Sequence, residues 1–164
     1  LNTLYKPSTM TVLYGRDLSL QGIDTVAEAM NLVPGMFTGV DSDLVVRGLE
    51  KNWGSSNIMM MLNNQPVNST LIAYPTHLLK MPVEMIERIE VVRGPGAELS
   101  TEFAISASIN VITRAHNSAY VKYGEFNRKT IGSNYTDSNT QLNFAYAQGE
   151  QSDYLIKSDS LVNK

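Results

Sequence analysis

The charged side chains at positions 87–90 are candidates for acid–base catalysis. Glu87 and Glu90 are carboxylates close in sequence, a pattern that can supply a general acid and a general base. Ile89 and Val91 alternate with the charged residues, which is typical of a half-buried strand. Arg88 and Glu90 then share the exposed face, where pairing with neighbouring strands is favoured over catalysis. No catalytic residue is predicted, and the protein is not expected to be an enzyme.

Residues that bind metal ions are sparse. Asp41 and Asp43 resemble the start of a calcium loop, but no glycine or glutamate follows at the spacing of an EF-hand, so a solvated turn is favoured. The chain has no cysteine, and a site built on His77 and His116 would need carboxylates to complete it. The methionines at 59–61 alternate across a strand and cannot converge on one ion. Neither a metal site nor a cofactor is predicted.

Composition and charge limit the class of protein. The chain has 164 residues, 43% hydrophobic and 18% charged, which suffices for one domain with a short appendage. A net charge of -3 provides no basic surface for phosphates, so no nucleic-acid partner is expected. No run approaches the roughly 20 apolar residues of a membrane-spanning helix. Barrel strands need only about 10 alternating residues, so the lack of such a run does not exclude a β-barrel membrane protein.

The first 114 residues alternate between short strands, a helix and long loops. Asp24 is expected to cap a helix over 25–32, which Pro34 and Gly35 end. Loops at 48–57 and 67–80 are long for a compact domain. A ligand-binding role for these loops is favoured over disorder. This pattern predicts a small mixed α+β domain that ends near Arg114. Strands are expected at 11–14, 44–47, 58–62, 88–93 and 108–113, with Ile89, Val91, Ile109 and Val111 facing inward.

After Arg114 the pattern changes to alternating polar and apolar residues with few aliphatic side chains. Leu142, Phe144 and Tyr146 share one face of a strand, and small or polar residues share the other. This alternation is typical of strands in a membrane barrel. Strands are expected at 119–126, 129–136, 140–148 and 152–157, and residues 115–164 are predicted to form the first strands of an incomplete barrel.

Several motifs in fixed order resemble the plug domains of TonB-dependent outer-membrane transporters. They are the strand at 11–14, Val33-Pro34-Gly35, Val46-Arg47-Gly48, the turn at 62–67, and the segment 86–114 with its Ile-Glu-Arg-Ile-Glu-Val core. The similarity covers roughly residues 11–114. It implies a small mixed β-sheet plug with short helices and long loops over residues 1–114, followed by antiparallel β-hairpins that begin a transmembrane barrel.

The resemblance also implies a function and a set of contacts. A plug fills the barrel, binds a small metal chelate or vitamin on its outer loops, and is pulled by TonB from the periplasmic side of the outer membrane. Arg47 and Arg93 match the family's arginines that face barrel carboxylates, with Glu90 as a third plug–barrel contact; capping of strand ends is the alternative for the arginines. Trp53 would face ligand or pack on the domain's own core. The ligand-facing loop residues implied are Asp41, Asp43, Trp53, Ser55, Asn57, Asn68 and Tyr74.

The chain departs from the family pattern in places where glycine is usual. The turn has Asn64-Gln65 in place of Asp-Gly, and the family's Tyr-Gly and Gly-Gly pairs are replaced around 101–102 and 106–108. Such replacements imply an altered loop between Ala97 and Ser108. They leave open a free-standing periplasmic binding or interaction protein on the same fold. Unpaired strand edges at 119–157 further predict self-association.

Overall fold

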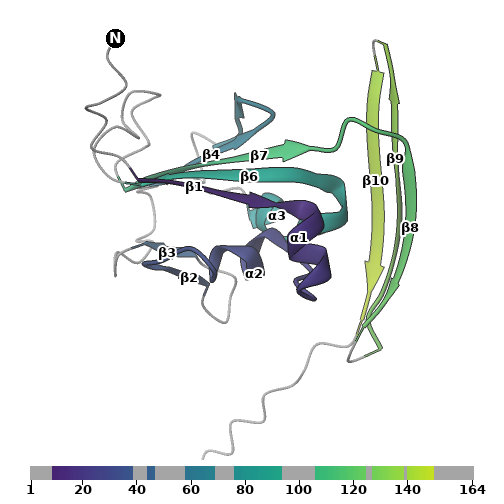
Figure 1. Ribbon diagram of the computed structural model, residues 1–164, viewed down its shortest axis with the longest axis horizontal. Helices are drawn as coiled ribbons and strands as arrows, with labels where there is room; N and C mark the ends of the chain where they lie inside the picture. The colour runs from purple at the N-terminus through teal and green to yellow at the C-terminus, as the bar shows by residue number, and fades with distance from the viewer. Residues whose placement is uncertain are drawn as a thin grey trace, which may run out of the picture.

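The computed structural model describes residues 9–38, 44–46, 58–68, 76–93, 106–124, 127–138 and 140–149. These residues form two main sheets, and one end of the larger sheet lies against a face of the smaller (Figure 1). We call the larger sheet, its helices and a small hairpin the body. The second sheet is called the β8–β10 sheet. No helix among the described residues is long and apolar enough to cross a membrane.

The body is built on a mixed five-stranded sheet. All neighbouring strands are antiparallel except β4 and β7, which run parallel. Its strands, in spatial order, are β1 (Thr9–Tyr14), β6 (Ile86–Arg93), β7 (Ala107–Thr113), β4 (Ile58–Leu62) and β5 (Gln65–Pro66). A separate hairpin pairs β2 (Met36–Thr38) with β3 (Leu44–Val46). The mixed α+β architecture expected from the sequence is confirmed.

Short helices cover one face of this sheet and enclose the core. They are α1 (Gly15–Leu20), α2 (Val26–Met30), α3 (Thr76–Leu79) and the 3-10 helix η2 (Val83–Met85). Ile89, Val91, Ile109 and Val111 are fully buried beneath them, as the strand alternation predicts. Met60 joins this core, whereas Met59 packs with Met61 on the opposite face. The loop expected at 67–80 was wrong in its last part, because α3 forms there.

Helix α2 begins one residue later than the sequence suggests. Thr25, and not Asp24, is the N-cap, and its Oγ1 accepts a hydrogen bond from the Glu28 amide at 3.3 Å. The Asp24 amide donates to Glu28 Oε2 at 2.8 Å, which completes a reciprocal capping arrangement. The Asp24 carboxylate is therefore free to leave the helix and reach the β8–β10 sheet.

The turn between β4 and β5 is a two-residue turn at Asn63 and Asn64. Their φ angles are 50° and 66°, the left-handed conformation that a type I′ hairpin requires. Asparagine tolerates this conformation better than most residues, which explains how the turn forms without glycine. The family's Asp-Gly pair was expected at Asn64-Gln65, whereas the two turn residues are Asn63 and Asn64.

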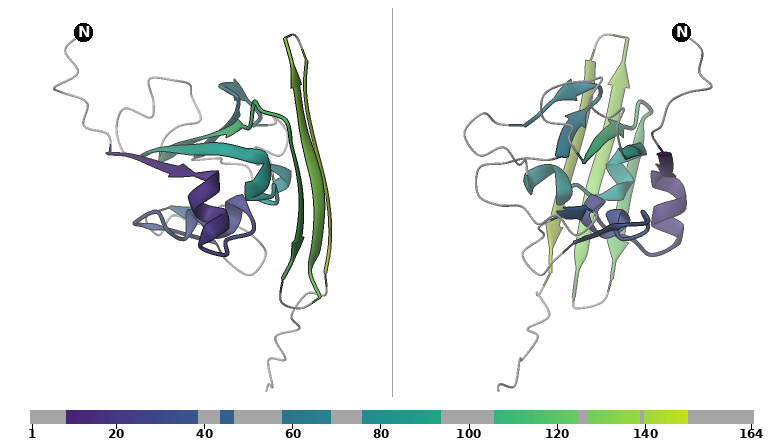
Figure 2. Two further views of the ribbon diagram at one scale, coloured as in Figure 1. Left: turned by 45° about the vertical axis from the view of Figure 1, so that its right-hand side comes forward. Right: turned by 90° about the vertical axis from the view of Figure 1, so that its left-hand side faces the viewer.

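The β8–β10 sheet contains β8 (Ser118–Tyr123), β9 (Lys129–Asp137) and β10 (Thr140–Gln148), with β9 in the centre and all pairs antiparallel. These are three of the four strands expected from the sequence; residues 152–157 lie outside the described residues. The strands extend past the end of the body (Figure 2). The face away from the body exposes Val121, Tyr123, Ile131, Tyr135, Leu142, Phe144 and Tyr146.

Gly15 provides a test of the packing between α1 and the sheet. A Cβ at this position would lie 2.0 Å from the Ile86 carbonyl oxygen and 2.9 Å from that of Val83. We expect Gly15→Ala to lower the free energy of unfolding by about 1–3 kcal/mol, the usual range for overpacking. Urea unfolding measures this change. Gly124→Ala is the matched control, since its nearest neighbouring atom would lie at 3.8 Å; equal effects of the two substitutions would contradict the close approach.

Candidate functional site

The face of the β8–β10 sheet that meets the body is polar. Alternation places Tyr120 and Lys122 of β8 on this face, together with Thr130 and Asn134 of β9. Thr130 is 8% exposed and Asn134 is 2% exposed, so the body covers them closely. The sheet thus presents polar groups to the body and apolar groups to the outside.

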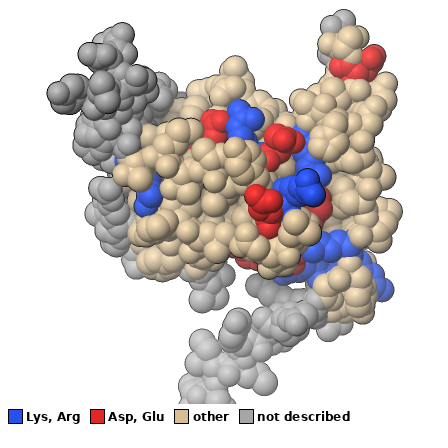
Figure 3. Space-filling model, in the orientation of Figure 1, with Lys and Arg blue, Asp and Glu red and all other residues tan. Residues whose placement is uncertain are grey.

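Five charged side chains meet where the body adjoins this face, and we call them the ionic cluster. They are Asp24, Glu28 and Glu84 of the body with Lys122 and Arg128 of the β8–β10 segment. Lys122 Nζ lies 2.5 Å from Asp24 Oδ1 and 3.0 Å from Glu84 Oε1. Arg128 pairs with Asp24 and lies 3.5 Å from Glu28 Oε1. Acidic and basic atoms adjoin each other at this junction in Figure 3.

The local fold explains how two distant body segments bring carboxylates to one ammonium group. Asp24 precedes α2, and its backbone oxygen accepts from the Val83 amide at 3.1 Å. Glu84 follows in η2, where its Oε1 also accepts from Ser19 Oγ at 3.1 Å. The Glu84 side chain is only 10% exposed. Lys122 therefore neutralises a carboxylate that would otherwise lie in a poorly solvated position.

Electrostatics at Asp24 reflect two opposing effects. Burial alone would raise the pKa of its carboxyl, but hydrogen bonds and charge from Lys122 and Arg128 lower it. The net result holds the pKa of Asp24 below its ordinary value of 3.8. The carboxylate is thus held in its ionised form by cations of the β8–β10 segment.

Neutral hydrogen bonds make a second set of contacts between the body and the β8–β10 sheet. Gln141 Nε2 of β10 donates to Thr113 Oγ1 at 2.9 Å and to the Arg114 carbonyl at 2.5 Å. Asn134 Nδ2 donates to the Glu84 carbonyl at 3.4 Å. Thr113 is held in turn by Asn63 of the hairpin turn, whose Oδ1 accepts from the Thr113 amide at 2.9 Å. Polar contacts thus extend across the junction.

A cavity of about 380 Å³ lies beside the ionic cluster, between the body and the β8–β10 sheet. Its lining includes Asp24, Lys80 and Glu84 from the body, and Lys122, Arg128 and Thr130 from the other side. Among the described residues, no group of three or more histidine, cysteine or acidic side chains could hold a metal ion.

Three of the residues proposed from sequence lie in the described parts of the chain. Arg93 donates to the Pro34 carbonyl and to Thr11 Oγ1, the latter at 3.1 Å. Glu90 pairs with Arg88 at 2.7 Å and accepts from Asn110. Both thus contact the body itself rather than the β8–β10 sheet.

Asn68, the third, binds the backbone of β4. Its Oδ1 accepts from the Met60 amide at 2.7 Å, and its Nδ2 donates to the Ile58 carbonyl at 3.0 Å. These bonds show that Asn68 stabilises the β4–β5 hairpin. The other proposed residues lie outside the described residues: Arg47, Asp41, Asp43, Trp53, Ser55, Asn57 and Tyr74.

The ionic cluster was not predicted from the sequence. A signal was present, because Lys122 alternates with Val121 and Tyr123 and must share the polar face of β8. Its partners were not visible, since Asp24 was assigned to a helix cap. Only the packing of the two sheets brings these residues together.

The fold and this junction define a class of protein: a small mixed α+β domain held by polar contacts against an antiparallel sheet whose other face is apolar. Comparison with protein families agrees. The family model described as TonB-dependent Receptor Plug Domain matches residues 3–115. The chain belongs to this family, and the body is its plug.

Curated relatives include an outer membrane protein and a vitamin transporter. The chain is 30% identical over 115 residues to the Iron-regulated outer membrane virulence protein of Vibrio cholerae, covering 66% of this chain and 17% of the relative. It is 26% identical over 118 residues to the Vitamin B12 transporter BtuB of Vibrio vulnificus, covering 68% and 18%. The chain thus spans less than a fifth of the relatives that it matches.

Solved structures show the same fold. The alcaligin outer membrane receptor FauA of Bordetella pertussis has a TM-score of 0.64 at 18% identity, with 92% of this chain and 28% of that chain covered. The ferric-catecholate import receptor Fiu of E. coli K12 has a TM-score of 0.62 at 20% identity, with 90% and 22% covered. These matches confirm the predicted plug architecture followed by antiparallel strands.

The lowered pKa of Asp24 predicts how stability depends on pH. Its ionised form stabilises the fold fully above the ordinary value of 3.8, and this contribution is lost as pH falls through the lower folded-state pKa. We expect Asp24→Asn to reduce the free energy of unfolding by about 1–3 kcal/mol at pH 7. The difference from the unsubstituted protein should shrink toward pH 2. Urea unfolding at both pH values measures it.

Asp17→Asn is the control, because Asp17 is an exposed carboxylate in the first turn of α1. Its effect should be smaller than that of Asp24→Asn. An effect of Asp24→Asn that stayed constant from pH 7 to pH 2 would contradict the ion-pairing account.

Proposed function

We propose that the chain is the gating part of a TonB-dependent outer-membrane receptor: a plug over residues 1–114 and the first wall strands over 115–164. The observation that supports this most is the chemistry of the junction. The body meets the β8–β10 sheet through ion pairs and amide hydrogen bonds, while its apolar core is closed on itself. Such an interface can separate and become hydrated without exposing the core.

The proposed cargo is a scarce nutrient such as an iron–siderophore complex or a vitamin. Names of the relatives support this class, since they include a vitamin B12 transporter, an alcaligin receptor and a ferric-catecholate import receptor. Ligand contacts are proposed for the loops that contain Asp41, Asp43, Trp53, Ser55, Asn57, Asn68 and Tyr74. TonB is the proposed partner that displaces the body from the periplasmic side.

Further contacts with the rest of the wall are proposed for Arg47, Arg93 and Glu90. Arg93 suits this role, because its side chain is only partly buried and a guanidinium group is suited to pairing with a carboxylate of a further wall strand.

A reversible crosslink between the body and the β8–β10 sheet tests the gating role. The chain has no cysteine, so Glu84→Cys and Asn134→Cys introduce one pair at a position where Asn134 already contacts the Glu84 backbone. In the full-length receptor, oxidation should stop ligand uptake, because the body can no longer move away from the wall. Reduction should restore uptake, and ligand binding at the cell surface should remain in both states.

A pair within the wall provides the control. Ser118 and Asn134 lie on adjacent strands, and Asn134 Nδ2 is 2.8 Å from Ser118 Oγ. Crosslinking Ser118→Cys to Asn134→Cys should leave uptake unchanged. Normal uptake with a fully formed body-to-wall crosslink would show that this junction does not open during transport.

A further inference from the structure

The ionic cluster is divided by charge sign. Its three carboxylates, Asp24, Glu28 and Glu84, belong to the body, whereas both cations belong to the β8–β10 segment. This polarity is the reverse of that implied for Arg47 and Arg93, where the body would supply the cations. Separation of the two parts would therefore leave the carboxylates of the cluster on the body and its cations on the β8–β10 segment.

The body-facing side of the β8–β10 sheet has no carboxylate among its described residues. Besides Lys122, the face holds neutral side chains, and Asp137 lies on the exposed side by alternation. Nothing in this part of the sheet could neutralise Lys122 and Arg128 once the body has moved. The neutral residues of this face are Ser118, Tyr120, Thr130, Gly132, Asn134, Thr136, Gln141, Asn143, Ala145 and Ala147.

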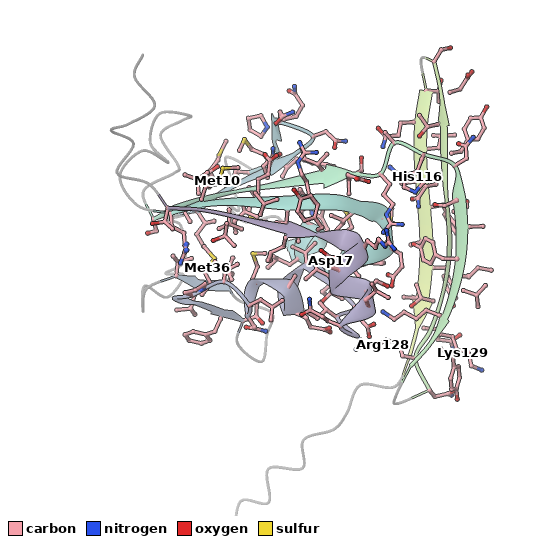
Figure 4. The ribbon with its side chains drawn as sticks, viewed as in Figure 1. Met10, Asp17, Met36, His116, Arg128 and Lys129 are labelled. Atoms are coloured by element: carbon pink, nitrogen blue, oxygen red, sulfur yellow. The ribbon has the colours of Figure 1, made fainter. Side chains whose placement is uncertain are left out.

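A cavity lies beside these cations. The cavity of about 380 Å³ is bounded by both cations of the cluster and by the carboxylates of Asp24 and Glu84. Lys80 of the body adds a third cation to the lining. Figure 4 shows Arg128 on the side of the sheet that faces the body, whereas Lys129 points away from it. Removal of the body carboxylates would give this cavity a cationic lining.

We infer that displacement of the body uncovers Lys122 and Arg128 as a cationic strip on the wall, and that the passage opening there selects anionic cargo. This inference rests on the proposed gating function and adds the charge class of the cargo to it. A cleft lined by one sign of charge concentrates ions of the opposite sign. Ferric chelates that carry carboxylate or catecholate groups belong to this anionic class.

Ion selectivity of the opened receptor tests the inference with chloride and potassium as probes. The full-length receptor is placed in a planar lipid bilayer, and mild urea is added to loosen the body. The reversal potential in a KCl gradient then reports the permeability ratio of chloride to potassium. We expect this ratio to fall several-fold in the double variant Lys122→Gln with Arg128→Gln. The control is Lys129→Gln, which removes one positive charge from the opposite side of the sheet and should leave the ratio nearly unchanged.

Two outcomes would overturn the inference in distinguishable ways. An unchanged permeability ratio in the double variant, with conductance present, would overturn the cationic strip and leave gating intact. Absence of any urea-induced conductance would contradict the occluding role of the body. It would also contradict the proposed passage.

A second variant tests the same inference if the double variant assembles poorly. Asp24→Asn with Glu84→Gln frees the wall cations without removing them. This variant should raise the chloride preference at low urea, and a lowered preference would contradict the inference.

Discussion

The contact of Lys122 with Asp24 and Glu84 is the interaction on which the arrangement of the two sheets depends. One ammonium group from β8 binds carboxylates from the start of α2 and from η2. Without it, two partly buried carboxylates of the body would lie beside each other at the junction without the ammonium group that pairs with both, at a large desolvation penalty. The same contact fixes the body against the β8–β10 sheet and ties two body segments to each other.

Polar contact also means that the junction does not depend on buried apolar area. A buried apolar interface would keep the body in place through the area it hides from water, whereas ion pairs and amide bonds can exchange their partners for water at a modest free-energy cost. The buried apolar residues of the body form its own core beneath α1, α2 and α3. The apolar side chains of the β8–β10 sheet lie on the opposite face, so neither surface of the junction relies on them.

Much of the fold could be predicted from the sequence because strand alternation is a local property. Ile89 and Val91 face the core, and Leu142 and Phe144 face outward, as period-two alternation requires. The cap of α2 could not be predicted as well, since Asp24 and Thr25 are both good N-caps and tertiary contacts decide between them. Pairing of Asp24 with Lys122 depends on how two sheets pack, and no spacing in one sequence encodes that distance. The loop residues proposed to face ligand remain predictions.

A double-mutant cycle on Lys122 and Glu84 tests the central claim most directly. Lys122→Met and Glu84→Gln are made singly and together in the full-length receptor, and urea unfolding of the body is followed with a fluorophore attached to it. We expect a coupling free energy of about 0.5–3 kcal/mol, the range found for residues in direct contact. Effects of the two substitutions that simply add would show that Lys122 does not hold the body through Glu84, and would contradict the account.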